Sequence, residues 1–340
     1  MRLPGLPAAL VLLGLLGVLV AAVPVSAAPT GEGIVVAVLD SGVDSTHPEL
    51  QGRVERLSFQ PVVPGLPLGP GMAVADPNGQ GTAVASIIAG ANLGLAPQAR
   101  ILDLQVSARY TGTTLDPLAE QAAIDAMDYL LANPGRAQVA ILSFASRGVS
   151  ATGAQTLAEQ AQGLRDKGVL VIVPSGPTLS QLHGDGSVVT VAGTDCAPGA
   201  QQGSADRPRK PDLVAEHANV RAAQAASPTN PSGGGTGSFT GSAYAAAQVA
   251  GAAALMLDAR DDLPVDAAAA ILRGTAAEAG EPGVDECNGF GLLTPTAAWA
   301  AAEAWSDPLL EFPTKPTPAP AAWLTLAGLG LGVAVLRRRA

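Results

Sequence analysis

The run IVVAVLDSGVDSTHPEL at residues 34–50 contains the strongest indication of the fold. Its first six residues are all apolar, which is typical of a strand buried on both faces of a parallel sheet. Asp40 follows this run directly, and open parallel sheets place ligands at the carboxyl ends of their strands. We therefore predict a buried strand that presents Asp40 at a functional edge of a sheet.

Segments with the features of strands and helices alternate along the rest of the chain. Short apolar runs predict strands, and longer segments with helical spacing predict helices. The predicted strands are Ile34–Leu39, Ile101–Val106, Val139–Phe144, Val169–Val173 and Val188–Ala192, and the predicted helices are Ala83–Ala89, Leu118–Leu131, Thr156–Lys167, Ala243–Leu257 and Val265–Arg273. This alternation predicts an α/β fold with a mostly parallel sheet.

Ordered motifs resemble those of the subtilisin-like serine peptidases, the subtilases. The run at 40–50 resembles their Asp segment, NGQGTAVA at 78–85 their His segment, and GSAYAAAQVAG at 241–251 their Ser segment. KPDLVA at 210–215 and NGFGLL at 288–293 resemble two further family elements. The resemblance covers about residues 33–300 and implies a subtilisin-like three-layer fold, with a mostly parallel central sheet flanked by helices.

The resemblance implies a catalytic triad and an oxyanion-binding amide, and the chain departs from both. Asp40 stands at the triad Asp position, but Gln80 stands at the His position and Ala243 at the Ser position. Pro177, in VPSGP at 173–177, stands where the family has its oxyanion amide. Glutamine cannot serve as a general base, alanine has no hydroxyl, and proline has neither a side-chain donor nor an N–H. We expect an inactive homologue in which Asp40 simply accepts hydrogen bonds from Gln80, or from Ser and backbone groups in the loops.

A displaced triad is the rival interpretation. Three histidines, His47, His183 and His217, are the candidates for a replacement base, and Ser242 is the nearest hydroxyl. Ser242 stands one residue before the nucleophile position, where a side chain is rotated by about 100° on a helix, and it is better suited to capping that helix. Three functions therefore stay open: a pseudopeptidase that binds a peptide or protein, a serine endopeptidase with a displaced triad, and a structural surface domain with a blocked cleft.

In subtilases a substrate peptide lies in a cleft as an added strand, and the resemblance assigns two cleft edges here. One edge is Ser143, Phe144 and Ala145, and the other is Ser175 and Gly176. Strand addition supplies affinity through main-chain hydrogen bonds. We expect this surface to persist in a homologue that has lost its chemistry.

Two cysteines, Cys196 and Cys287, are too few for a disulfide-rich scaffold or a four-cysteine zinc site. We expect them to form a disulfide, because the body is predicted to be exported; two free thiols are the alternative. No metal site and no cofactor are expected. Several acids could contact calcium as in some subtilases, but solvated surface acids are the preferred interpretation of Asp44, Glu49, Asp258, Asp261 and Asp262.

The two ends of the chain predict export and a membrane attachment. Residues 1–27 have a positive start, an apolar run and small residues before a cleavage point, as in a secretory signal; an uncleaved anchor is the alternative. The subtilase-like domain is predicted at 28–305 and a Pro-rich spacer at 306–320. Residues 321–340 form an apolar segment with an Arg cluster, which resembles sorting tails of the PEP-CTERM type, although an ordinary tail anchor fits as well.

The net charge of the chain limits the classes of partner that it can be expected to bind. The formal net charge is −10 and the pI is near 4.7, which argues against nucleic acid as a partner. The remaining candidates are a peptide or protein ligand and, through the C-terminal helix, a membrane.

Overall fold

The computed structural model describes residues 27–59, 76–106, 117–146, 149–176, 188–195, 211–226 and 234–306. Apart from Ala27 and Ser306, the predicted signal, spacer and C-terminal anchor lie outside these ranges. Within the described ranges, no helix combines the length and apolar character needed to cross a bilayer.

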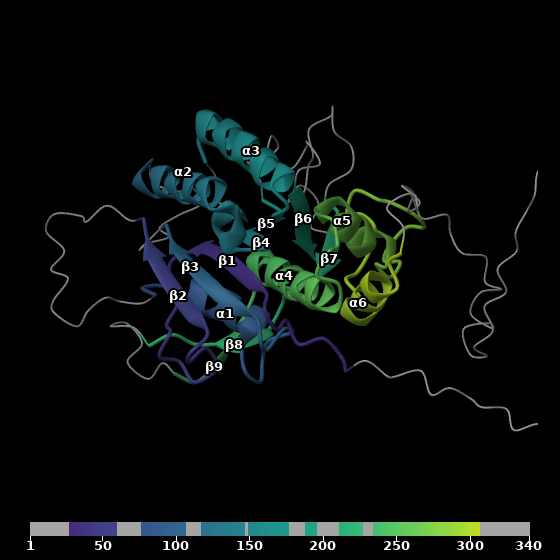
Figure 1. Cartoon of the computed structure of the whole chain (residues 1–340), viewed down its shortest axis with the longest axis horizontal. Helices are drawn as coiled ribbons and strands as arrows, with labels where there is room; N and C mark the ends of the chain where they lie inside the picture. The colour runs from purple at the N-terminus through teal and green to yellow at the C-terminus, as the bar shows by residue number, and fades with distance from the viewer. Residues whose placement is uncertain are drawn as a thin grey trace, which may run out of the picture.

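A seven-stranded sheet of order β2-β3-β1-β4-β5-β6-β7 forms the centre of the protein (Figure 1). All of its strand pairs are parallel. The strands are β1 (Val35–Asp40), β2 (Val54–Ser58), β3 (Arg100–Gln105), β4 (Val139–Leu142), β5 (Leu170–Pro174), β6 (Val188–Gly193) and β7 (Leu213–Ala215). A separate antiparallel pair consists of β8 (Val220–Ala223) and β9 (Thr236–Phe239).

Helices cover both faces of the sheet (Figure 1). On one face lie α2 (Pro117–Ala132) and α3 (Ala151–Asp166); the other face carries α1 (Gln80–Ala89), α4 (Ser242–Ala259), α5 (Val265–Gly274) and α6 (Pro295–Glu303). Two short 3-10 helices, η1 (Pro134–Arg136) and η2 (Ser143–Ser146), flank β4. The predicted α/β three-layer architecture with a mostly parallel sheet is therefore confirmed.

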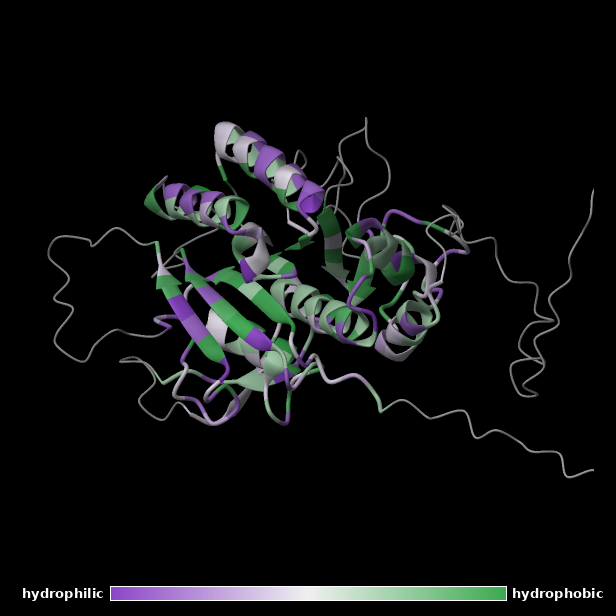
Figure 2. Cartoon of the chain, viewed as in Figure 1, coloured by the Kyte–Doolittle hydropathy of each residue, from purple (hydrophilic) through white to green (hydrophobic). Residues whose placement is uncertain are grey.

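The two-residue period of a strand explains the two cores. Val36 and Val38 of β1 pack into the core beneath α1 and α4, whereas Ala37 and Leu39 pack into the core beneath α2 and α3. All four side chains are apolar, as is typical of a strand that is covered on both faces. Figure 2 shows hydrophobic residues along most of the strands, with hydrophilic bands in β2 and β3 and along α2 and α3.

The predicted strand Val139–Phe144 is two residues too long. β4 ends at Leu142, and Ser143–Ser146 turns into η2. The side chain of Phe144 is fully buried in the core beneath α2 and α3.

Candidate functional site

Asp40 ends β1 at the carboxyl edge of the sheet. Leu39 pairs with Leu142 on β4, and Ile141 pairs with Ile172 on β5. This register puts Asp40, Ser143 and Pro174 at about the same level on three adjacent strands. Since neighbouring strands lie about 4.8 Å apart, the end of β5 is roughly 10 Å across the sheet from Asp40.

The Asp40 carboxylate is fully buried and accepts hydrogen bonds from several donors. The backbone N–H of Ser41 donates to Oδ1 at 2.6 Å, and Ser143 Oγ donates to Oδ2. The side-chain amide of Gln80 also donates to Oδ2, with an Nε2–Oδ2 distance of 3.3 Å. The Gln80 amide therefore points its NH2 group at Asp40, because its oxygen would be repelled by the carboxylate.

Gln80 reaches Asp40 because α1 begins directly against the loop after β1. A Cβ at Gly81 would lie 2.1 Å from Gly42 O and 3.1 Å from the Asp40 Cβ, so only glycine fits there. Asp76 holds the same junction: its carboxylate accepts from Ser41 Oγ at 2.7 Å and from the Gly79 and Thr82 N–H groups at 2.9 and 2.7 Å. Burial raises the pKa of Asp76, against these hydrogen bonds, which lower it.

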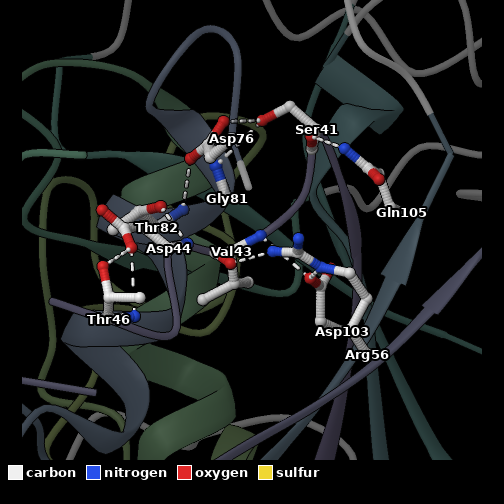
Figure 3. Close-up of polar contacts among 10 residues, drawn as sticks. All are labelled: Ser41, Val43, Asp44, Thr46, Arg56, Asp76, Gly81, Thr82, Asp103 and Gln105. Carbon is white, nitrogen blue, oxygen red and sulfur yellow. Dashed lines mark hydrogen bonds and ion pairs between the residues drawn. The ribbon is translucent and has the colours of Figure 1, made fainter. Parts of the chain in front are cut away.

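Further polar contacts hold the loop that follows Asp40 (Figure 3). Asp103 Oδ2 accepts from the Val43 N–H at 2.9 Å, and Thr82 Oγ1 accepts from the Asp44 N–H at 2.9 Å. The side-chain amide of Gln105 donates to Ser41 O at 2.9 Å. The loop that follows β1 is therefore hydrogen-bonded to side chains of β3 and of α1.

Ala243 is the second residue of α4 and is buried, with 5% of its surface exposed. The adjacent Ser242 donates its hydroxyl to Ser175 O at 3.0 Å. This hydrogen bond joins the start of α4 to the end of β5, and no side-chain cap is present at the helix start, contrary to the capping role expected for Ser242. Pro177, the predicted oxyanion position, lies outside the described residues.

Neither described histidine is available as a base for Ser242. The Nε2 of His47 lies 2.8 Å from Gly235 O, and its Nδ1 accepts from the Glu49 N–H at 3.1 Å. The Nδ1 of His217 accepts from the Thr194 N–H at 3.1 Å, and its Nε2 lies 2.8 Å from Asp195 Oδ1. Both rings thus have their two nitrogens occupied, and His183 lies outside the described residues.

The two cleft edges differ from the extended strands that we expected. Strand addition requires extended backbone, but Ser143, Phe144 and Ala145 belong to η2, and the side chains of Ser143 and Phe144 are fully buried. On the other edge, the Ser175 N–H donates to Val191 O at 2.7 Å, and Ser175 O accepts from Ser242. Ser175 and Gly176 of this second edge are both partly exposed.

The interpretation of the acids weighed as calcium contacts as solvated surface groups is wrong for Asp44 and Glu49, which are buried and accept hydrogen bonds. Glu49 Oε2 accepts from the N–H groups of Asn92 and Leu93 at 2.8 and 3.2 Å, and Asp258 Oδ2 accepts from Thr30 and Gly31 at 2.6 and 2.8 Å. Burial raises the pKa of Glu49, but these amide hydrogen bonds outweigh it and the pKa is lowered. In the described part of the chain, no three His, Cys, Asp or Glu side chains are placed to hold a metal ion.

Cys287 is disulfide-bonded. Cys196, the other cysteine of the chain, lies outside the described residues, so their pairing stays a prediction.

Sequence reasoning missed how Ser143 acts at this site. Ser143 was assigned to a peptide-binding edge, yet its hydroxyl contacts the Asp40 carboxylate. Asp76 and Asp103 were also missed. A polar residue directly after a predicted strand is the signal that could have linked Ser143 to Asp40, because adjacent parallel strands end at one edge.

Comparison with known proteins places these features in a family. A profile described as Peptidase_S8, the subtilase family, matches residues 31–291. The chain is 36% identical over 87 residues to the subtilisin-like protease PopC of Myxococcus xanthus, covering 25% of this chain and 18% of PopC. It is 28% identical over 147 residues to subtilisin-like protease 3 of Pseudogymnoascus destructans, covering 43% and 33% of the two chains. The chain thus spans a third or less of the length of these relatives.

Solved structures show the same fold. Fervidolysin from Fervidobacterium pennivorans, a keratinolytic enzyme, superposes with a TM-score of 0.59 at 21% identity, covering 80% of this chain and 43% of fervidolysin. The prenylagaramide maturation protease PagA superposes with a TM-score of 0.58 at 23% identity, covering 80% and 94% of the two chains.

Proposed function

The chain belongs to the subtilase family, and on that premise we propose that it is an exported, membrane-tethered homologue without peptidase activity that binds a peptide or protein. The observation that carries the proposal is the hydrogen bond from Gln80 to Asp40, at a site where the second residue of α4 is Ala243 in place of a nucleophile. The side-chain amide of Gln80 donates to the Asp40 carboxylate, as the ring N–H of a neutral histidine would, but it cannot accept a proton as a base does.

The missing groups are enough to remove hydrolysis. Loss of the Ser or the His alone lowers turnover by about 10⁶ in such enzymes, and an oxyanion donor contributes about 10² to 10³ more. The retained Asp40 supplies neither a nucleophile nor a base, because its function in a triad is to orient the imidazole. We therefore assign Asp40 a structural role, as the acceptor for Ser41, Gln80 and Ser143.

Export and tethering rest on the two chain ends. The N-terminal segment has the pattern of a secretory signal, and the C-terminal apolar segment ends in three arginines that favour the cytoplasmic side. This orientation leaves the subtilase domain on the extracytoplasmic face.

A structural surface domain with a blocked cleft is the second candidate, and a specific observation favours it. The η2 turn at one edge and the saturated Ser175 backbone at the other both reduce the main chain available to a ligand. Binding by this chain would then depend on side chains near Gln80 rather than on strand addition.

Labelling with a serine-reactive fluorophosphonate tests the loss of activity. The full chain should stay unlabelled under conditions in which an active subtilase is labelled completely. Labelling that is abolished by Ser242→Ala would support the displaced triad and overturn the proposal.

Selection from a phage-displayed library of linear peptides separates the binder from the blocked domain. We expect enriched peptides whose binding is lost in Gln80→Arg, which adds bulk and charge beside Asp40. Gln98→Arg is the matched control, because Gln98 is exposed and its backbone N–H contacts Thr30 O, away from this site. No enrichment, or equal loss in both variants, would favour the structural domain.

A further inference from the structure

The guanidinium group of Arg56 links the edge strand β2 to the neighbouring strand β3 and to the loop after Asp40. Arg56 lies on the edge strand β2 and pairs in register with Asp103 on β3. Its Nε donates to Asp103 Oδ2 at 2.6 Å, and its Nη2 donates to Val43 O (Figure 3). Val43 also donates its N–H to the same Asp103 oxygen, so both of its backbone polar groups depend on this pair.

The two partners differ in their access to water. Asp103 is fully buried, whereas the side chain of Arg56 is 25% exposed. Asp103 Oδ2 accepts both hydrogen bonds, and Oδ1 is buried without a hydrogen-bond partner among the described residues. A buried carboxylate oxygen without a donor is costly when the group is charged, and a proton on Oδ1 removes that cost.

Among the residues that the structure describes, few charges face Asp103. Arg56 faces it from β2, and the buried Asp76 from the segment before α1 repels its charge. Among the elements next to β3, α1 has no charged residue, and β1 has only Asp40 at its end. Burial raises the pKa of Asp103 to about 7, Arg56 opposes this rise, and Asp76 adds to it.

We propose that Arg56 and Asp103 form a proton-operated clamp on the loop that carries the chain away from Asp40. With Asp103 ionised, the charged pair keeps Arg56 on Val43 O and ties β2 to the loop. When Oδ1 takes one proton from solvent, Oδ2 keeps the Val43 N–H but loses its charge. Arg56 then turns toward water, and the Val43 carbonyl loses its partner.

The clamp matters because the loop lies beside the candidate site. Ser41, whose N–H donates to Asp40, is two residues before Val43. Release of Val43 thus loosens the segment that positions Asp40 against Gln80. The clamp does not depend on whether the site binds a ligand. It is therefore tested independently of the proposed function.

NMR of the full chain in detergent micelles tests the clamp. The Asp103 carboxyl carbon should titrate with a midpoint near pH 7, and the Arg56 Nε–H should lose protection against exchange over the same range. Because the ratio of ionised to protonated Asp103 changes about tenfold per pH unit, protection should fall at least about tenfold from pH 8 to pH 6.

Variants separate this device from a general effect of pH. Asp103→Asn should show low Arg56 protection that is independent of pH. Glu55→Gln is the matched control on the same strand, because Glu55 forms an exposed ion pair with Arg136, and it should leave the transition unchanged. Constant Arg56 protection in the wild type, or an Asp103 midpoint below pH 5, would overturn the proposal even where no variant folds.

Discussion

Gly81→Ala should destabilise the protein by about 1–2 kcal/mol, although alanine is the better helix former. The new Cβ would lie 2.1 Å from Gly42 O, a rigid backbone atom, and 3.1 Å from the Asp40 Cβ. The start of α1 and the loop would have to separate by about 1 Å to restore an ordinary contact. Overpacking of this kind costs about 1–3 kcal/mol, against a helix-propensity gain of up to about 1 kcal/mol.

Gly163→Ala is the matched control in the interior of α3. Its Cβ would approach the Leu131 Cδ2 at 2.9 Å, but this atom is the end of a flexible side chain that can rotate away. The propensity gain should then remain, so this variant should be stabilised by about 0.5–1 kcal/mol. The same substitution in two helices should thus have opposite signs.

Urea unfolding followed by far-UV circular dichroism measures both effects. The midpoint should fall for Gly81→Ala and rise for Gly163→Ala, while the m-value stays unchanged. A midpoint for Gly81→Ala equal to or above that of the wild type would refute the close packing of α1 on the loop. It would also remove the reason why Gln80 reaches Asp40.

Three further predictions concern chemistry, pH and the disulfide. Gln80→His and Ala243→Ser should each show no hydrolysis of a fluorogenic peptide, and the double variant should hydrolyse it only weakly. Adding Pro177→Asn to the double variant should raise its rate by about 10² to 10³. Clear hydrolysis by the unmodified chain would contradict the proposed function. The free energy of unfolding should fall as pH rises from about 4 to about 7, because folded Asp103 binds its proton more tightly than the unfolded chain does. This contribution is on the order of 4 kcal/mol, and a pH series of urea titrations should show it flattened in Asp103→Asn; parallel curves for the two proteins would count against it. Cys287→Ser should lower the unfolding free energy by about 2–5 kcal/mol, and a thermal melt unchanged by this substitution would show that the bond contributes nothing.

The sequence predicted the parts of the fold that depend on local patterns. The apolar run at 34–39 is a buried strand because β1 is covered on both faces, and Asp40 follows at the carboxyl edge as its position predicts. The contact between Gln80 and Asp40 was also anticipated, because ordered motifs bring the two segments together. These features follow from periodicity and motif order, which a single chain carries within short windows.

Short or partly exposed elements were not predicted. The edge strand β2 and the β8–β9 pair lack a continuous apolar run, so their periodicity is weak. The end of β4 was placed too late, because the segment up to Phe144 is locally strand-like although Ser143–Ser146 forms η2.

The residue pattern was enough to infer the fold, the edge at which Asp40 lies, and the absence of a base and a hydroxyl at Gln80 and Ala243. Which groups satisfy the buried carboxylates became visible in the folded chain. Ser143 reaches Asp40, and Arg56 reaches Asp103, across registers between strands that are distant in the chain. The physical reason is that a buried charge selects its partners by distance and desolvation, and both are set by packing rather than by neighbouring residues in the sequence.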